Sequence, residues 1–385
     1  MFSSRLAWNL APNPLSRLLE EKRAAGVPIL DLTESNPTAA GFTYPSDQIL
    51  AALADPRLLR YEPAAAGMAS ARAAVAEYYA GAVPPDRILL TASTSEAYAY
   101  VFKLLADPGD EVLVPRPSYP LFEFLASLES VRVVQYPLVY HGGWAIDFHA
   151  LAQSISPRTR AIVVVNPNNP TGSFVKHEEL AQLIGLARNH GLALVSDEVF
   201  CDYVFGDDPR RARSLTSVDE VLTFCMSGLS KIAGLPQLKL GWIAAGGPAA
   251  ACREALERLE LIADTYLSVG TPVQWAASAL LACREQMQGQ ILARIRKNRE
   301  YLASQLGPQS PWRILDTEGG WYAILEATRI HSEEEWVLKL LSSDGVLVQP
   351  GFFFDFEREA FLVLSLLTPP DVWQEGVRRI LAHAR

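Results

Sequence analysis

Short apolar runs along the chain end in corners rich in Gly, Pro, Ser, Thr and Asn. Several corners are followed by apolar positions with helical spacing, as at 98–105 and 177–190. The apolar runs predict five strands, at 87–90, 111–114, 161–165, 192–195 and 221–226. Nearly continuous apolar strands that alternate with helices indicate an α/β fold, with a mainly parallel central sheet flanked by helices on both faces.

Each predicted strand leads into a polar corner. The corners lie at 91–97, 115–120, 166–172, 196–200 and in the loop that contains Lys231. In parallel sheets, ligands bind beyond the carboxyl ends of the strands. We therefore expect the corners to meet at one edge of the sheet and to form a site there.

Composition and charge limit the classes of partner. The chain has 385 residues, 49% of them hydrophobic, which suffices for a large core. Its net charge of -9 argues against binding to nucleic acid or to an anionic membrane surface. No run approaches the roughly 18 apolar residues of a membrane span, and the N-terminal segment lacks the apolar core of a signal peptide.

The cysteines and histidines do not suggest a metal site. The four cysteines form no C-x-x-C pair and no ligand-like cluster with the six histidines. We therefore expect neither a zinc site nor a disulfide framework, and we expect a reducing, cytoplasmic location.

The loop around Lys231 carries the most informative chemistry. An apolar run stops, small residues follow, and the pair Ser230 and Lys231 precedes a second cation, Lys239, eight positions on. A lysine amine forms an imine with an aldehyde, which suits pyridoxal 5'-phosphate, and a later cation can neutralise the phosphate. By itself, a lysine in a Ser- and Gly-rich loop is more often a solvated surface residue.

Two other corners place polar groups after buried strands. Asp197 is either a structural acid or a carboxylate that pairs with the pyridine nitrogen of the cofactor and keeps it protonated. Asn169 lies in a turn rich in Asn and Pro, which turn chemistry alone explains. Its side-chain amide can also donate to the ring hydroxyl of the cofactor.

The first two corners add a phosphate cradle and an aromatic face. Thr94 and Ser95 either cap the helix that follows or bind phosphate together with the amide groups and dipole of that helix. Tyr119 is either a core residue or a ring that stacks on the pyridine. The order and spacing of all these groups favour the cofactor interpretation, because the structural alternatives do not require that order.

Together, these motifs make the chain resemble the class I/II aminotransferases of pyridoxal-phosphate fold type I, which include aspartate aminotransferase. The resemblance covers nearly the whole length and rests on Tyr61, Gly67, Arg72, 94–97, 118–120, 168–172, 196–198, 228–231, 241–242, 319–320 and 350–351. It implies a large cofactor-binding domain at 45–280. It also implies a small α+β domain, made of 1–44 and 281–385, and a homodimer with active sites at the subunit boundary.

The resemblance also assigns roles to individual residues. Lys231 is implied to be the Schiff-base lysine, Asp197 the partner of the pyridine nitrogen, Asn169 the ring-hydroxyl donor and Tyr119 the stacking ring. The phosphate-binding positions of the family are matched by Thr94, Ser95, Ser230 and Lys239, and Tyr61 resembles the residue that reaches the phosphate of the partner subunit.

Three positions depart from the family pattern. Lys239 stands where the family usually has arginine, which exchanges a fork of donors for a point charge. Phe200 replaces a tyrosine whose hydroxyl contacts the ring oxygen. Val363 stands where an arginine grips the α-carboxylate of the substrate. Arg116 and Arg5 are the candidates for a relocated carboxylate contact.

The resemblance implies a transaminase that moves an amino group from a small amino compound to a 2-oxo acid. In this reaction Lys231 is the general acid and base. Other pyridoxal-phosphate reactions, namely β-elimination or C–S cleavage, decarboxylation and cyclisation, use the same residues and stay open. A non-catalytic, effector-sensing domain is the remaining alternative, since fold alone does not determine function.

Overall fold

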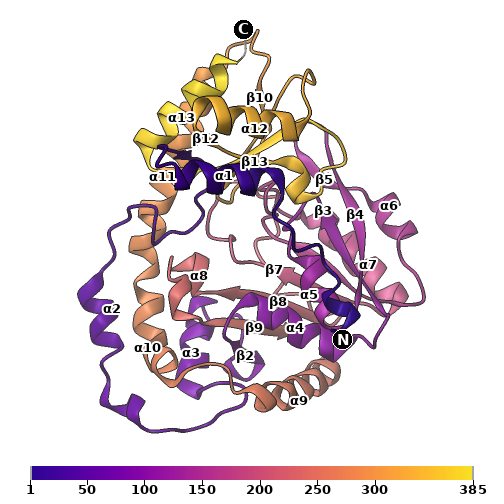
Figure 1. Cartoon of the computed structure of the whole chain (residues 1–385). Coiled ribbons are helices and arrows are strands. Elements are labelled where there is room, and N and C mark those ends of the chain that lie inside the picture. The colour runs from indigo at the N-terminus through magenta and orange to yellow at the C-terminus, as the bar shows by residue number, and fades with distance from the viewer. Residues whose placement is uncertain (1, 384–385) are drawn as a thin grey trace.

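The centre of the molecule is an eight-stranded mixed sheet (Figure 1). Its strands, in spatial order, are β2 (Ile88–Thr91), β9 (Gly241–Gly246), β8 (Thr223–Gly228), β7 (Ala193–Asp197), β6 (Thr159–Val165), β3 (Glu111–Arg116), β4 (Arg132–Tyr140) and β5 (Trp144–Ile146). Neighbours from β8 to β4 are parallel, whereas β9 is antiparallel to β2 and β8, and β5 is antiparallel to β4. The computed structural model describes residues 2–383.

Helices cover both faces of this sheet because its strands are apolar on both sides. The α-helices of the whole molecule, including those that do not lie on this sheet, are α1 (Pro14–Ala24), α2 (Ser46–Ala52), α3 (Ala69–Tyr78), α4 (Thr94–Leu105), α5 (Phe122–Leu128), α6 (Phe148–Gln153), α7 (His177–His190), α8 (Leu229–Ile232), α9 (Ala249–Tyr266), α10 (Thr271–Ala282), α11 (Arg284–Gln305), α12 (Glu333–Asp344) and α13 (Pro370–Ala382). Leu89 and its neighbour Leu90 illustrate the alternation. Leu89 packs in the cluster that includes α4 and α9, and Leu90 packs in the cluster that includes α3, α7 and α10.

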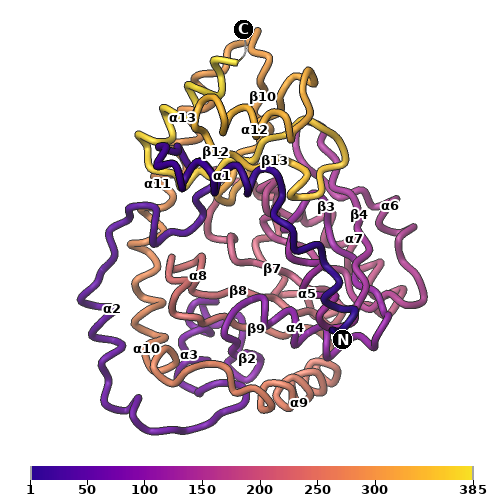
Figure 2. Tube along the Cα trace, viewed as in Figure 1, coloured from indigo at the N-terminus to yellow at the C-terminus, as the bar shows by residue number. Residues whose placement is uncertain are grey.

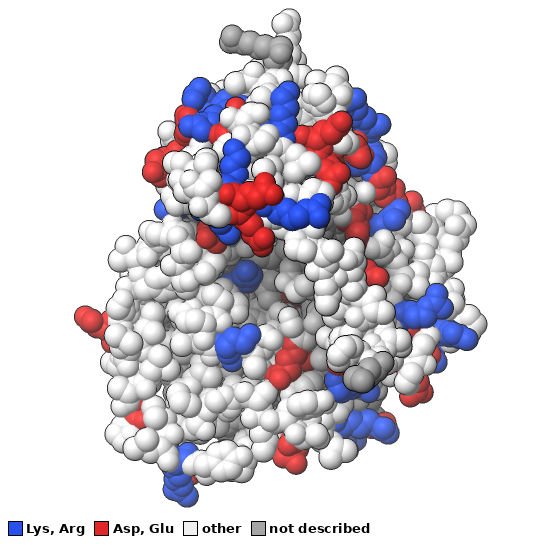
Figure 3. All heavy atoms as spheres, viewed as in Figure 1, with Lys and Arg blue, Asp and Glu red and all other residues white. Residues whose placement is uncertain are grey.

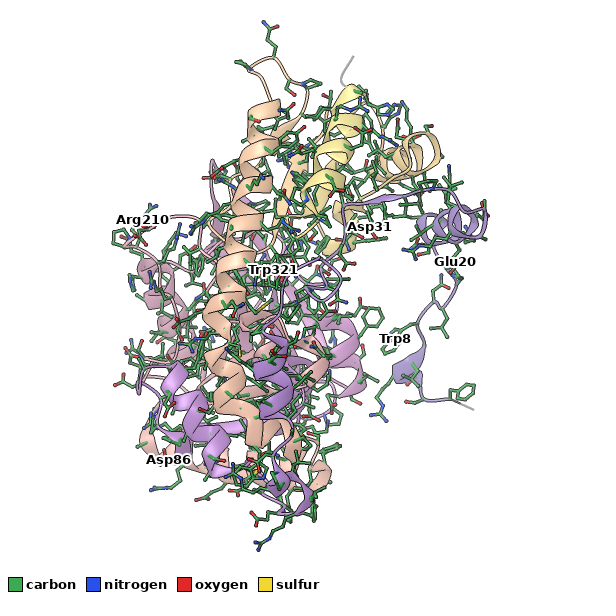
Figure 4. All side chains as sticks on the ribbon, turned by 90° about the vertical axis from the view of Figure 1, so that its left-hand side faces the viewer. Trp8, Glu20, Asp31, Asp86, Arg210 and Trp321 are labelled. Atoms are coloured by element: carbon green, nitrogen blue, oxygen red, sulfur yellow. The ribbon has the colours of Figure 1, made fainter. Side chains whose placement is uncertain are left out.

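A second, smaller part is built on a four-stranded antiparallel sheet. Its strands, in order, are β10 (Arg313–Ile314), β11 (Tyr322–Glu326), β14 (Phe361–Ser365) and β13 (Gln349–Pro350). We call this sheet, together with α1, α12, α13 and the adjoining end of α11, the small part, and the central sheet with its covering helices the large part. The long helix α11 runs between the two parts (Figure 4).

The N-terminal segment belongs spatially with the C-terminal residues. Strand β1 (Leu30–Asp31) pairs in parallel with β12 (Val346–Leu347), and α1 packs on α12. The tube view shows the indigo α1 beside orange and yellow elements (Figure 2). This placement agrees with a small domain made of both ends of the chain. The domain boundaries after residues 44 and 280 stay a prediction.

The predicted strands are all present, and the α/β architecture is confirmed. The helix expected at 98–105 begins four residues earlier, at Thr94, because the hydroxyl of Ser93 accepts a hydrogen bond from the backbone of Glu96 at 3.2 Å. Helix α7 spans the predicted 177–190. Within residues 2–383, no helix has the length and apolarity to cross a membrane.

Candidate active site

Lys231 lies in the short helix α8, directly after β8. Gly228 permits this turn, because a Cβ there would lie 2.8 Å from the carbonyl oxygen of Leu240. The hydroxyl of Tyr203 donates to the Lys231 carbonyl at 2.6 Å and so fixes the backbone of the lysine. The lysine side chain therefore starts from a fixed backbone in α8, at the carboxyl end of β8.

Aromatic rings surround the Lys231 amine. Its Nζ lies 4.9 Å from the ring centroid of Trp321 and 5.5 Å from that of Phe200. Burial lowers the pKa of this amine to about 8, and the nearby carboxylate of Asp197 opposes that change. About a tenth of the amine is therefore neutral at pH 7, far more than for an ordinary lysine, and the neutral form is the one that a nucleophile or a base requires.

Asp197 ends the buried strand β7. One of its carboxylate oxygens accepts from the Tyr98 hydroxyl at 3.2 Å, and the other accepts from the backbone of Val199 at 3.2 Å. Burial raises the pKa of Asp197 to about 6, although both hydrogen bonds and Lys231 favour the charged form. A carboxylate in this state gains from a cationic partner.

The two asparagines of the 166–172 corner differ in their surroundings. Asn168 is engaged in the fold, because its amide donates to the Pro117 carbonyl at 2.9 Å and accepts from the Ser118 hydroxyl at 2.9 Å. Asn169 is buried, and its side-chain oxygen has no hydrogen-bond partner among residues 2–383. Buried amide groups are nearly always paired, so the oxygen of Asn169, unlike the amide of Asn168, is left free by the fold.

Tyr119 stands at the tip of its corner with 37% of its surface exposed. Burial of its hydroxyl, with added influence from Asp197 and Tyr322, raises the pKa of Tyr119 to about 12. The backbone of Ser118 donates to the Phe354 carbonyl at 3.0 Å, which ties the corner to the small part.

The start of α4 is capped by a residue other than the two predicted phosphate ligands. Ser93, which sequence reasoning missed, is the capping residue. Thr94 and Ser95 are therefore released from the capping role, and both are half-buried. Strand β9 passes close by, because a Cβ on Gly241 would lie 3.1 Å from the backbone carbon of Ser93.

The other predicted phosphate ligands flank this helix start. Ser230 is half-buried beside Lys231. Lys239 is exposed, with a left-handed φ of 53°, and lies two residues before Gly241. The chain thus brings the loop of Lys231 and the start of α4 to the same edge of the sheet. Tyr61 does not join them, because it lies on an outer loop with 72% of its surface exposed.

The surroundings of the proposed carboxylate contacts differ from expectation. The Arg116 guanidinium forms an ion pair with Glu357, and Arg5 donates to the Leu128 carbonyl at 3.0 Å. Val363 is fully buried in β14. The position at which the resemblance implies a guanidinium therefore carries a buried apolar side chain, and both candidate cations have other partners.

Sequence reasoning also missed Trp321, which comes from the small part. Its ring packs against Phe200 at 5.2 Å and Tyr203 at 5.1 Å between centroids. Figure 4 places it in the interior, midway between the upper and lower elements. The space-filling view shows a hollow between the two parts, with blue side chains on an otherwise mostly uncharged face (Figure 3).

Comparison with known proteins identifies the family. The model of the family "Aminotransferase class I and II" matches residues 27–380. The chain belongs to this family. The aminotransferase is 30% identical over 367 residues to an alanine aminotransferase of Mycobacterium tuberculosis, covering 92% of this chain and 85% of the relative.

Two further relatives agree with this assignment. The aminotransferase is 28% identical over 368 residues to the glutamate-pyruvate aminotransferase AlaA of Escherichia coli, covering 93% of this chain and 90% of the relative. Its structure resembles that of an Escherichia coli aminotransferase with a TM-score of 0.88 and 26% identity, covering 100% and 98% of the two chains. The expected family and the fold type I architecture are confirmed, and the chain is a transaminase of a family that uses pyridoxal phosphate.

Proposed function

We propose that this aminotransferase holds pyridoxal 5'-phosphate through Lys231 and moves an amino group between a small amino compound and a 2-oxo acid. One observation carries the proposal. The Lys231 amine, whose pKa burial lowers to about 8, and the Asp197 carboxylate, whose pKa burial raises to about 6, influence each other at the carboxyl edge of the sheet. Perturbed groups that converge in this way are typical of catalytic sites.

The surrounding residues fit this cofactor. The side-chain oxygen of Asn169 is buried and lacks a partner, so the fold does not hold this amide through its oxygen, and its NH2 group would donate to the ring hydroxyl. The start of α4, with Thr94 and Ser95, offers unpaired backbone N–H groups to the phosphate, and Ser230 and Lys239 add a hydroxyl and a cation. The ring of Tyr119 supplies an aromatic face.

Each of the residues around the cofactor would then have a separate role. When bound, the cofactor supplies an electron sink that stabilises negative charge at the substrate Cα. Asp197 keeps a proton on the pyridine nitrogen, because its buried carboxylate gains from the adjacent positive charge. Lys231 would take the proton from Cα and deliver it to the cofactor carbon that retains the amino group, and a pKa of about 8 permits both roles near neutral pH. Phe200 and Trp321 exclude water from this amine.

The test is to locate the lysine that carries the cofactor. Borohydride reduction of the purified holoenzyme, followed by peptide mass mapping, is expected to label Lys231. The Lys239→Ala variant is the matched control, because it removes a neighbouring lysine and should keep the label on Lys231. A label on another lysine, or none in a cofactor-saturated sample, contradicts the proposal.

We also propose a homodimer in which Tyr61 reaches the cofactor phosphate of the partner subunit. Large apolar side chains are exposed on one segment before α3, with Leu50 at 65%, Leu59 at 86% and Tyr61 at 72%. Figure 3 shows few charges on the face over α2 and α3. A concentration of exposed apolar surface is typical of an interface between proteins.

The third proposal is a non-standard carboxylate anchor. Val363 is fully buried, while Arg116 and Arg5 are engaged elsewhere. A charge-assisted pair of hydrogen bonds from a guanidinium is worth roughly 3 kcal/mol or more, so its loss weakens binding of ordinary α-amino acids. The binding of substrates whose acid group is masked, distant or absent is not weakened by the absence of this guanidinium. This proposal leads to the question of what replaces the arginine.

A further inference from the structure

The neighbours of Val363 in the small sheet are defined by the strand register. In β14, Val363 lies directly opposite Ile324 of β11 on one side and Gln349 of β13 on the other. Side chains directly opposite each other on antiparallel strands project to the same face of the sheet. Gln349 therefore shares its face with the residue that replaces the family's arginine.

This face of the small sheet is directed toward Lys231. Tyr322 lies opposite Ser365 in the same register, and Ser365 is two residues from Val363, so both belong to that face. The Tyr322 ring lies 6.5 Å from the ring of Phe200, which in turn lies 5.5 Å from the Lys231 Nζ. The Gln349 side chain thus starts from the sheet face whose Tyr322 approaches Phe200 and, through it, Lys231.

The side-chain oxygen of Gln349 lacks a hydrogen-bond partner among residues 2–383. This oxygen is buried, although the residue as a whole is only partly buried. A buried amide oxygen without a partner is destabilising, so this oxygen is available to accept a hydrogen bond from a ligand. Sequence reasoning passed over this residue, because a lone glutamine before Pro350 and Gly351 carries no motif.

We propose that Gln349 is the residue that determines substrate specificity in place of the missing arginine, by binding the substituent on the substrate Cα. The inference rests on the proposed aminotransferase function. A glutamine amide is neutral, and it both accepts and donates. Its complement is a primary carboxamide or a hydroxyl. A carboxylate, which only accepts, leaves the buried Gln349 oxygen unpaired. The favoured class is therefore α-amino amides and amino alcohols.

The experiment compares three probes that differ only in this substituent: L-alanine, L-alaninamide and L-alaninol. Single-turnover conversion of the aldehyde form of the holoenzyme to the amine form gives an apparent Kd and a maximal rate for each. We expect the wild type to bind L-alaninamide or L-alaninol at least ~10-fold more tightly than L-alanine, since one hydrogen bond changes affinity by about that factor.

Substitution of the amide then assigns the preference to Gln349. Gln349→Leu and Gln349→Met each remove the hydrogen-bonding group and keep the bulk. Both should raise the Kd of the amide and the alcohol about 10-fold, with little change for L-alanine and in the maximal rates. Gln305→Leu, an exposed glutamine at the end of α11, is the matched control and should change nothing. Two variants are used so that one misfolded protein does not decide the outcome.

The outcomes separate the inference from the function on which it rests. If L-alanine binds as tightly as the amide, or if both Gln349 variants keep the wild-type preference, the role of Gln349 is wrong while the aminotransferase stands. If a broad panel of amino compounds fails to convert the bound aldehyde, the proposed function fails and the inference falls with it.

Discussion

Lys231 and Asp197 show one physical cause with two opposite effects. Burial disfavours charge, so it lowers the pKa of the lysine to about 8 and raises that of the aspartate to about 6. Both groups therefore change protonation within a few units of neutral pH. Burial of an acid and an amine in this state lowers the free energy of unfolding of the protein, as is common at functional sites.

We predict that Asp197→Asn stabilises the cofactor-free protein at neutral pH. The folded pKa of about 6 lies above the ordinary 3.8, so the folded state prefers the neutral acid, and stability is lost as pH rises through this window. The difference corresponds to about 3 kcal/mol at most, at about 1.4 kcal/mol for each pKa unit. Urea unfolding of both apo proteins at several pH values measures it.

The pH dependence provides the control. Below about pH 4 the aspartate is protonated in both states, so the advantage of Asp197→Asn should disappear. Asp208→Asn should give no gain at any pH, because the Arg210 side chain lowers the pKa of Asp208 instead. In the holoenzyme, Asp197→Asn should lose most of its turnover. If the stability advantage of apo Asp197→Asn over the apo wild type is no larger at pH 7 than at pH 4, the burial argument is refuted.

Residues within strand-end corners could be predicted from the sequence, and residues that meet through tertiary folding could not. Lys231, Asp197 and Asn169 each follow a buried apolar run, so their shared location follows from the geometry of parallel sheets. Trp321 and Gln349 reach the site from another sheet, and no local pattern indicates which face they occupy. The site roles assigned by resemblance stay predictions.

At the scale of elements, the contact of β9 with the start of α4 positions the proposed phosphate cradle. Glycine at 241 allows backbone to approach Ser93, and Thr91 lies on the same side. The sequence indicated that β2 and β8 are strands, but it did not reveal that β9 lies between them in the antiparallel direction. Strands buried on both faces look alike in either direction, because their apolar pattern does not encode the partner.

We predict that Gly241→Ala weakens binding of the cofactor. The added Cβ would lie 3.1 Å from Ser93 backbone and from the Thr91 hydroxyl, so β9 and the start of α4 must separate. Strain of this kind costs about 1–3 kcal/mol, which corresponds to a loss of affinity of roughly 5- to 150-fold if all of it opposes binding. Titration of the apo protein with pyridoxal phosphate, followed by absorbance, measures the Kd.

The matched control is a glycine with free space. Gly185 lies in α7, and a Cβ there meets nothing within 4 Å. Gly185→Ala should leave the Kd unchanged and raise stability by about 1 kcal/mol, through helix propensity. If both variants bind the cofactor like the wild type, the close approach of β9 is irrelevant to the cradle.

At the scale of the whole molecule, the site lies where the large and small parts meet. Three contacts beside Tyr119 join the parts: Ser118 with Phe354, Arg116 with Glu357, and Gln135 with Asp355. The sequence indicated a small domain made of both chain ends, and β1 and β12 show how those ends pair. Tyr61 lies outside this arrangement, so the proposed contact of Tyr61 with a cofactor phosphate needs a second chain.

The last prediction tests that requirement. Leu59 is 86% exposed beside Tyr61, and the proposed dimer buries it. Leu59→Asp places a charge in that interface, where burial without a partner is costly, so the variant should shift toward monomers. It should also bind pyridoxal phosphate more weakly, because Tyr61 no longer reaches the partner's site. Analytical ultracentrifugation over a range of concentrations measures the first effect, and cofactor titration the second.

Ile330→Asp is the comparison. Ile330 is 65% exposed, but it lies in the small part, just before α12, far along the chain from the α2 segment. A charge there should change neither association nor cofactor affinity, since exposed substitutions away from interfaces have small effects. A wild type that sediments as a monomer at every concentration would exclude the dimer. A Leu59→Asp monomer with unchanged cofactor affinity would leave the dimer intact as an assembly, but would remove Tyr61 from the phosphate site.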